Sequence, residues 1–187
     1  METGLVSAIR SLKQPTPSRR FNNIVVGVIT NSDDRVPCIL SSFGLNVSRY
    51  RFGIDTGSLD LVREDFDVDF HCISYDVGFE KPDRRIFDTA DSLLSMILAM
   101  RYSGTTTTNC RDPGKWIKLY VGDEYEKDVV GSQKAGWKPI MLSDAQTPPG
   151  MTSIEDCQND SIDQAFAMYT ILHVNSIRQL SNWLMGA

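Results

Sequence analysis

The fold of this chain follows first from one apolar run, Ile24-Val25-Val26-Gly27-Val28-Ile29-Thr30-Asn31. Its apolar residues are continuous rather than alternating with polar ones, which is typical of a parallel strand buried on both faces. The run ends in a hydroxyl and an amide side chain. We therefore expect a strand over 23–30 that presents Thr30 and Asn31 at its carboxyl end, where parallel α/β sheets bind their ligands.

Strands and helices alternate along the rest of the chain. The helix over 85–100 is the clearest, because apolar residues recur at helical spacing behind the candidate N-cap Asp83. Further strands are expected at 70–74, 116–121, 138–142 and, as an edge strand, 171–174, and further helices at 36–43, 126–135 and from Ser176 to Met185. The alternation predicts an α/β fold, with a parallel sheet covered by helices on both faces.

Two more motifs follow strands of this predicted sheet. One is Gly78-Phe79-Glu80-Lys81-Pro82-Asp83, continued by Arg85-Ile86-Phe87. The other is Leu119-Tyr120-Val121-Gly122-Asp123-Glu124, with Asp128 five residues after Asp123 and then Gly131 and Ala135-Gly136-Trp137. Taken singly, each has a simpler interpretation as a surface turn or a capped helix start. It is their order that favours a functional interpretation.

In this order the three motifs resemble the second, third and fourth motifs of the haloacid dehalogenase-like (HAD) hydrolases. The group they resemble most is the HAD-like hydrolase domain-containing protein 3 group. The resemblance implies a Rossmann-like core and a phosphatase-type reaction through an aspartyl-phosphate. It implies that Thr30 and Asn31 bind phosphate, that Lys81 is catalytic, and that Asp123 and Asp128 bind Mg²⁺.

The same resemblance calls for an upstream strand ending in Asp-x-Asp, which supplies the nucleophile, and in many members for a helical cap. Residues 1–20 contain no aspartate, and their one acid is Glu2. We therefore expect a polar tail over 1–22 and a partial HAD-like core domain over 23–187, with the central nucleophile strand and the cap missing. Such a chain is expected to be catalytically impaired, and its Mg²⁺ site weak or vestigial.

A missing central strand would leave backbone groups without partners, at a cost of ~1–3 kcal/mol for each buried group. Three arrangements remain open. The strands over 23–30 and 116–121 could pair directly, or Leu5–Ile9 could fold back as a substitute strand. Alternatively, another polypeptide or a second copy of the chain could supply the strand.

Two further hypotheses follow from the missing nucleophile. The chain could be a non-catalytic protein-interaction module, or one part of a split enzyme completed by another chain. It could also remain an enzyme, acting on a phosphorylated small molecule with Asp33, Asp34 or Asp76 as a substitute nucleophile. The hypothesis of a substitute nucleophile is the weakest of these, because the placement of a nucleophile tolerates little error.

Composition narrows the partners and the compartment. The net charge of −5 does not favour nucleic acid, and no apolar run approaches the ~20 residues that span a bilayer. The four cysteines have no C-x-x-C spacing, and Cys38 and Cys72 are expected to be core residues in a reducing compartment, the cytoplasm or nucleus. His71 and His173 have no evident serine or cysteine partner in the sequence and are expected to be packed or surface residues.

Overall fold

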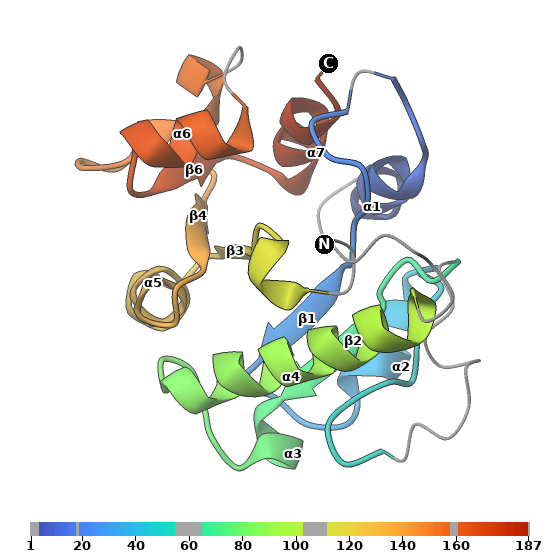
Figure 1. Cartoon of the computed structure of the whole chain (residues 1–187). Coiled ribbons are helices and arrows are strands. Elements are labelled where there is room, and N and C mark those ends of the chain that lie inside the picture. Colours follow the sequence, from blue (N-terminus) through green and yellow to red (C-terminus); the bar gives the residue numbers. More distant parts are fainter. Residues whose placement is uncertain (1–3, 18, 55–64, 103–111, 158–160, 187) are drawn as a thin grey trace. The chain divides into compact units, whose positions relative to one another are not determined.

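The computed structural model describes residues 4–17, 19–54, 65–102, 112–157 and 161–186. Its contacts gather in two compact units, whose elements are drawn in Figure 1. We call residues 25–117 the Lys81 unit, and residues 1–24 with 118–187 the Asp123 unit. Each unit has a sheet of its own among the described residues.

The Lys81 unit is built on two parallel strands, β1 (Gly27–Thr30) and β2 (Phe70–Ile73). Residues 47–51 run parallel to β2 on its other side, through isolated bridges from Val47 to Val68 and from Arg51 to His71. The helices of the unit are α2 (Val36–Ser42), α3 (Ser74–Val77), α4 (Arg84–Arg101) and the 3-10 turn η3 (Pro113–Lys115). β1 is shorter than predicted, because the N–H of Val26 bonds to the Asp69 carboxylate (2.6 Å) rather than to a strand backbone.

Helix α4 covers β1 and β2, as Figure 1 shows. Asp83 caps its start by accepting a hydrogen bond from the N–H of Arg85 (2.9 Å), as predicted. Every residue of the predicted apolar face is buried: Ile86, Phe87, Ala90, Leu93, Leu94, Ile97 and Leu98. This helix therefore confirms the sequence prediction in its type, its cap and its buried face.

The Asp123 unit contains a four-stranded parallel sheet in the order β3-β4-β6-β5. Its strands are β3 (Leu119–Gly122), β4 (Lys138–Leu142), β5 (Thr152–Ser153) and β6 (Leu172–Val174). The prediction that 171–174 is an edge strand is wrong, since β6 lies between β4 and β5. Short β5 escaped prediction, as did the 3-10 turn η5 (Ile154–Cys157) and α6 (Ile162–Met168), which has a complete Ser161–Gln164 capping box.

The N-terminal residues of the Asp123 unit form a helix, α1 (Leu5–Lys13). It packs beside α7 (Ile177–Met185), and the Ser181 hydroxyl donates to the carbonyl of Ala8 (3.1 Å). Ala8 and Leu12 are buried. Leu5–Ile9 is therefore not the substitute strand that we considered, and residues 5–13 are not part of a polar tail, because their helical face is buried against α7.

The strands over 23–30 and 116–121 belong to separate sheets, one in each unit. Within the described residues, β1 has β2 as its one strand neighbour, and β3 has β4. Each sheet therefore ends at one of the two strands that carry the predicted phosphate and metal residues.

The remaining predictions concern cysteines, inserted loops and the membrane. Cys38 is exposed, so its assignment to the core is wrong, whereas Cys72 is buried as expected. The turn-rich sequences over 53–68 and 101–115 predict surface loops, and both stretches fall largely outside the described residues. No helix in the described part of the chain combines the length and the apolar character that crossing a bilayer requires.

Candidate functional site

The first half of the candidate site lies where β1 ends. Thr30 is the last residue of β1, and Asn31 follows it directly. The Asn31 amide makes two hydrogen bonds with the main chain of Lys81: its Nδ2 donates to the Lys81 carbonyl (3.0 Å), and its Oδ1 accepts from the Lys81 N–H (2.7 Å). The structure thus brings Thr30, Asn31 and Lys81 together, although fifty residues separate the last two.

The loop that carries Lys81 is fixed at both ends. Before it, Gly78 ends α3 with φ +79°, a left-handed conformation that favours glycine. After it, the Asp83 carboxylate accepts from Arg85, which holds the pKa of Asp83 at about 2, and the Arg85 guanidinium lies 3.5 Å from the centre of the Phe79 ring. The conspicuous residues around Lys81 therefore build the loop, and the lysine itself is the residue they position.

The second half of the candidate site lies where β3 ends. Asp123 is exposed, whereas Asp128 is buried, with 3% of its surface accessible. Asp128 lies on η4 (Tyr125–Val130), a turn of π-helix that continues into α5 (Gly131–Lys134), where the sequence predicted one helix over 126–135. Its Oδ2 accepts from the N–H of Glu124 (3.0 Å), and its Oδ1 accepts from the Tyr120 hydroxyl (3.3 Å).

Gly122 is required for this arrangement. A β-carbon at position 122 would lie 2.3 Å from both Cγ and Oδ2 of Asp128, closer than real contacts allow. The missing side chain therefore makes room for the buried carboxylate. Because Asp128 also holds the N–H of Glu124, it fixes the turn from which Asp123 projects.

The carboxylate oxygens of this half are ligands of the type that Mg²⁺ prefers, although they are few. Mg²⁺ prefers oxygen ligands, and typically takes one or two carboxylates and completes its shell with water. Asp123 offers an exposed carboxylate, while both oxygens of Asp128 already accept hydrogen bonds. Within the described residues, no cluster of three or more histidine, cysteine or acidic side chains is arranged to hold a metal. The arrangement therefore suits a weak site centred on Asp123, with Asp128 as the residue that positions it.

The two halves belong to different units: Thr30, Asn31 and Lys81 to the Lys81 unit, and Asp123 and Asp128 to the Asp123 unit. Each half is ordered by hydrogen bonds within its own unit. Two of the substitute nucleophiles considered above are already engaged. Asp33 is paired with Arg35 (2.7 Å), and Asp76 lies 3.5 Å from Arg51.

Both histidines are buried, which confirms that they are packed, but sequence reasoning missed a partner. Nε2 of His173 lies 3.0 Å from the Ser143 hydroxyl, and Nδ1 lies 3.2 Å from the Thr147 hydroxyl. Ser143 follows β4 and His173 lies on the neighbouring β6, so parallel register brings them together. The position of Ser143 directly after a predicted strand was the signal available. The group ties the loop after β4 to β6. Hydroxyls lie at both ring nitrogens of His173, so among the described residues no carboxylate completes a catalytic triad with it.

Comparisons with known proteins concern the whole chain rather than single residues of the site. No family model matches the chain. It is 27% identical over 126 residues to an uncharacterized hydrolase of Schizosaccharomyces pombe, a match that covers 67% of this chain and 41% of that protein. It is 25% identical over 142 residues to an uncharacterized protein of Saccharomyces cerevisiae, covering 74% of this chain and 37% of that protein.

Solved structures give the fold. A HAD phosphatase from Thermococcus onnurineus superposes with a TM-score of 0.53 and 16% identity, over 100% of this chain and 59% of that chain. The HAD-hydrolase YfnB from Bacillus subtilis, solved with bound magnesium, superposes with a TM-score of 0.51 and 16% identity, over 97% of this chain and 53% of that chain. The chain therefore has the α/β fold of the HAD hydrolases, and the predicted resemblance is confirmed. It spans about two-fifths of the length of the curated relatives that it matches.

Proposed function

We propose that this chain carries the phosphate-binding and metal-binding loops of a HAD-type phosphatase and is catalytically impaired on its own. The observation that carries the proposal is the two-point hydrogen bond between the Asn31 side chain and the main chain of Lys81. It ties the strand end that carries the Thr30 hydroxyl and the Asn31 N–H donors to the loop that carries Lys81. Such fixed donors are what phosphoryl transfer requires, because the reaction depends mainly on positioning and charge stabilisation.

Each residue of the first half has a distinct role in this proposal. The Thr30 hydroxyl and the backbone N–H of Asn31 donate hydrogen bonds to phosphate oxygens. The Lys81 ammonium group neutralises negative charge on the phosphate, as a compact point charge does. The Asn31 side chain does not touch the phosphate, since both its polar atoms bond to Lys81, and it acts as a positioning residue.

The second half supplies the metal ligands. Asp123 would hold Mg²⁺ through its exposed carboxylate, and Asp128 would keep the 122–124 turn in place from inside. When bound, Mg²⁺ neutralises charge that develops on a transferring phosphoryl group. The site is expected to be weak, because an Asp-x-Asp motif that would add a ligand is not part of residues 1–22.

The proposed impairment concerns the carboxylate nucleophile. A HAD-type reaction forms a bond between a carboxylate oxygen and phosphorus, and residues 1–22 carry no Asp-x-Asp motif that could supply this carboxylate. Asp33 is held by Arg35 through a hydrogen-bonded ion pair that lowers its pKa. Asp123 and Asp128 are assigned to the metal. The chain is therefore expected to bind phosphate and to hydrolyse phosphate esters poorly.

A second candidate function rests on the ends of the two sheets. β1 and β3 each have a strand neighbour on one side within the described residues, and such edges accept added strands. We propose as the alternative that the chain is a protein-interaction module or one part of a split enzyme. In that case a partner, or a second copy of the chain, adds a strand at β1 or β3. A strand bearing Asp-x-Asp would also restore the nucleophile.

The test measures phosphate binding and hydrolysis separately. The whole chain would be assayed for Mg²⁺-dependent hydrolysis of p-nitrophenyl phosphate and for binding of inorganic phosphate, alongside Lys81→Ala and Asp123→Ala. The proposal expects little hydrolysis above the Asp123→Ala level and phosphate binding that Lys81→Ala weakens about tenfold or more. Arg84→Gln is the matched control, since Arg84 pairs with Asp88 on an exposed face of α4.

Two outcomes would overturn parts of this proposal. Robust hydrolysis abolished by Asp123→Ala would show that a nucleophile is present and that the chain is not impaired. Phosphate binding unchanged by Lys81→Ala would remove the assigned phosphate site. For the alternative function, an apolar peptide ending in Asp-x-Asp should raise hydrolysis while its Asn-x-Asn counterpart should not; binding of neither peptide would count against added strands.

A further inference from the structure

The helix that follows the candidate phosphate loop is unusual in its packing. α2 has no buried residue. Ile39 within it and Phe43 at its C-cap are 48% and 40% exposed. Pro37, Cys38 and Ser41 recur at helical spacing and therefore share one face, which lines a pocket. Their side chains are small, so this face of α2 leaves space in front of it.

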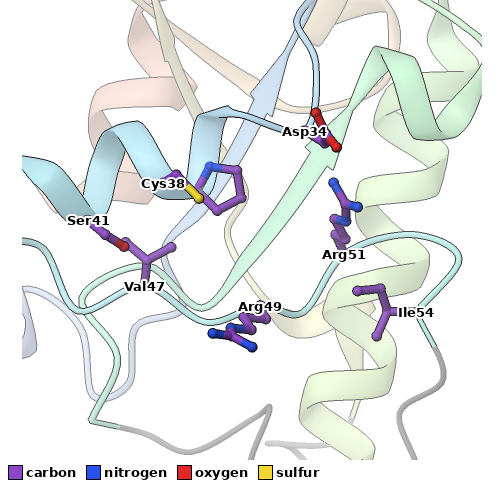
Figure 2. Close-up of a pocket in the computed structure, with 8 residues that line it drawn as sticks. Asp34, Cys38, Ser41, Val47, Arg49, Arg51 and Ile54 are labelled. Atoms are coloured by element: carbon purple, nitrogen blue, oxygen red, sulfur yellow. The ribbon is translucent and has the colours of Figure 1, made fainter.

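The opposite wall is the extended segment over 47–51. Ser48 and Tyr50 are buried, with 0% and 2% of their surface accessible, and alternate with Val47, Arg49 and Arg51. Because successive side chains in an extended segment point to opposite faces, the latter three share one face. Figure 2 shows these side chains and those of α2 around one pocket.

The pocket has a volume of about 500 Å³ and lies wholly within the Lys81 unit. Its apolar lining comes from Pro37, Val47 and Ile54, and its thiol from the exposed Cys38. This size suits a small organic molecule, and such sites combine an apolar wall with few polar groups. Neither Thr30, Asn31 nor Lys81 lines it, so it is distinct from the candidate phosphate loop.

The charges on the lining select the ligand. Arg51 lies 3.5 Å from Asp76, and Asp34 is a second acid of the lining, near Arg51 in Figure 2. Arg49 has no side-chain hydrogen bond or ion pair with another described residue. One guanidinium is thus left to bind an anion, while Asp34 disfavours a ligand with further negative charge.

We propose that this pocket binds a small organic monocarboxylate, whose carboxylate pairs with Arg49 and whose apolar body lies against Pro37, Val47 and Ile54. The site does not depend on the proposed phosphatase function. The guanidinium fork of Arg49 matches the two oxygens of a carboxylate. The apolar body fills the space that the small side chains of α2 leave open.

Cys38 provides a local readout of occupancy. The probe is 3-phenylpropionate, and the measurement is its protection of Cys38 from iodoacetamide, followed peptide by peptide by mass spectrometry. Cys72 and Cys157 are buried and serve as internal references. We expect 3-phenylpropionate to slow the alkylation of Cys38. Acetate, which lacks the body, and 3-phenylpropanol, which lacks the charge, should each protect at least tenfold less well at equal concentration.

Two variants assign the effect to Arg49. Arg49→Gln should raise the 3-phenylpropionate concentration needed for half protection about tenfold or more. Arg84→Gln, which removes an exposed arginine outside the pocket, should leave it unchanged. A thermal melt of each variant verifies folding, which Arg49→Gln should preserve because Arg49 is exposed.

The outcomes decide between this site and the phosphate loop. No protection, equal protection by 3-phenylpropanol, or an unchanged response in Arg49→Gln would each overturn the proposal. Lys81→Ala should weaken phosphate binding without changing the protection of Cys38. If protection instead fails in Lys81→Ala and persists in Arg49→Gln, the carboxylate acts through the phosphate loop and the pocket is not its site.

Discussion

The loop after β1 and the loop after β3 each place polar residues at the carboxyl end of a parallel strand, yet they are held in different ways. In the Lys81 unit, a neutral amide reaches across fifty residues to the main chain of Lys81. In the Asp123 unit, the buried Asp128 carboxylate bonds to Glu124 and Tyr120, which are four and eight residues away. The first loop is thus ordered by the tertiary fold, and the second is ordered locally.

The buried histidines extend this comparison. His173 of the Asp123 unit has a hydroxyl at each ring nitrogen. His71 of the Lys81 unit has one partner, the carbonyl of Ser48 at 3.1 Å from Nε2, and its buried Nδ1 has no hydrogen-bond partner among the described residues. Burial lowers the pKa of His71 to about 4. The two units should therefore respond differently to substitution and to acid, as the following predictions specify.

The largest effect is expected from Gly122→Ala. The new methyl group would displace the Asp128 side chain, which lies 2.3 Å away, and would break both its hydrogen bonds. We expect the free energy of unfolding to fall by about 3 kcal/mol, measured by urea denaturation. In an Asp128→Ala background the same change should cost much less. An equal loss of unfolding free energy in both backgrounds would show that Gly122 is not required to make room for the Asp128 side chain.

Acid should destabilise the chain through His71. Unfolded histidine has a pKa of about 6.5, and folded His71 has one of about 4, so the unfolded state binds more protons between these values. The contribution of neutral His71 to the free energy of unfolding is fully present above pH 6.5 and is lost as the pH falls towards 4. The expected loss between pH 7 and pH 5 is about 2 kcal/mol. His71→Gln should flatten this dependence, with His173→Gln as the control; a His71→Gln profile equal to that of the unsubstituted chain would contradict the assignment.

Removal of the long-range amide should have a moderate effect. Asn31→Ala deletes two hydrogen bonds in a half-buried position, and we expect a loss of about 1 kcal/mol of stability. Phosphate binding should weaken as well, because the loop that carries Lys81 is no longer tied to the end of β1. Asn22→Ala, an exposed asparagine before β1, is the matched control. Loss of stability without loss of phosphate binding would show that Asn31 does not position the site.

The smallest effect is expected from Asp83→Asn. The Arg85 hydrogen bond lowers the pKa of Asp83 to about 2 in the folded chain, below its unfolded value of about 3.9. Its contribution is therefore present above pH 4 and is lost as the pH falls towards 2. The difference in melting temperature between Asp83→Asn and the unsubstituted chain should be small at pH 6 and smaller at pH 3. A difference that grows with acid would contradict the ion-pair assignment.

Much of the fold could be predicted because it depends on patterns of residues that are close in sequence. Local sequence patterns were enough to predict four features: the apolar face of α4, its Asp83 cap, the strand over 138–142 and the burial of Cys72. The candidate loops could be located for the same reason, since each directly follows an apolar strand. The resemblance of three ordered motifs then predicted the HAD fold that the solved structures confirm.

Other features depended on contacts that no local pattern encodes. Helical spacing predicted α2 correctly but could not show that it buries none of its residues, because burial depends on what lies opposite. The same holds for Cys38, for the helix α1 against α7, and for the hydroxyls that meet His173. The sequence by itself determined the elements, the loops and their chemistry. Tertiary structure alone decided which loops are tied across long separations, which strands end the sheets, and where a pocket remains, because each depends on distances between segments far apart in the chain.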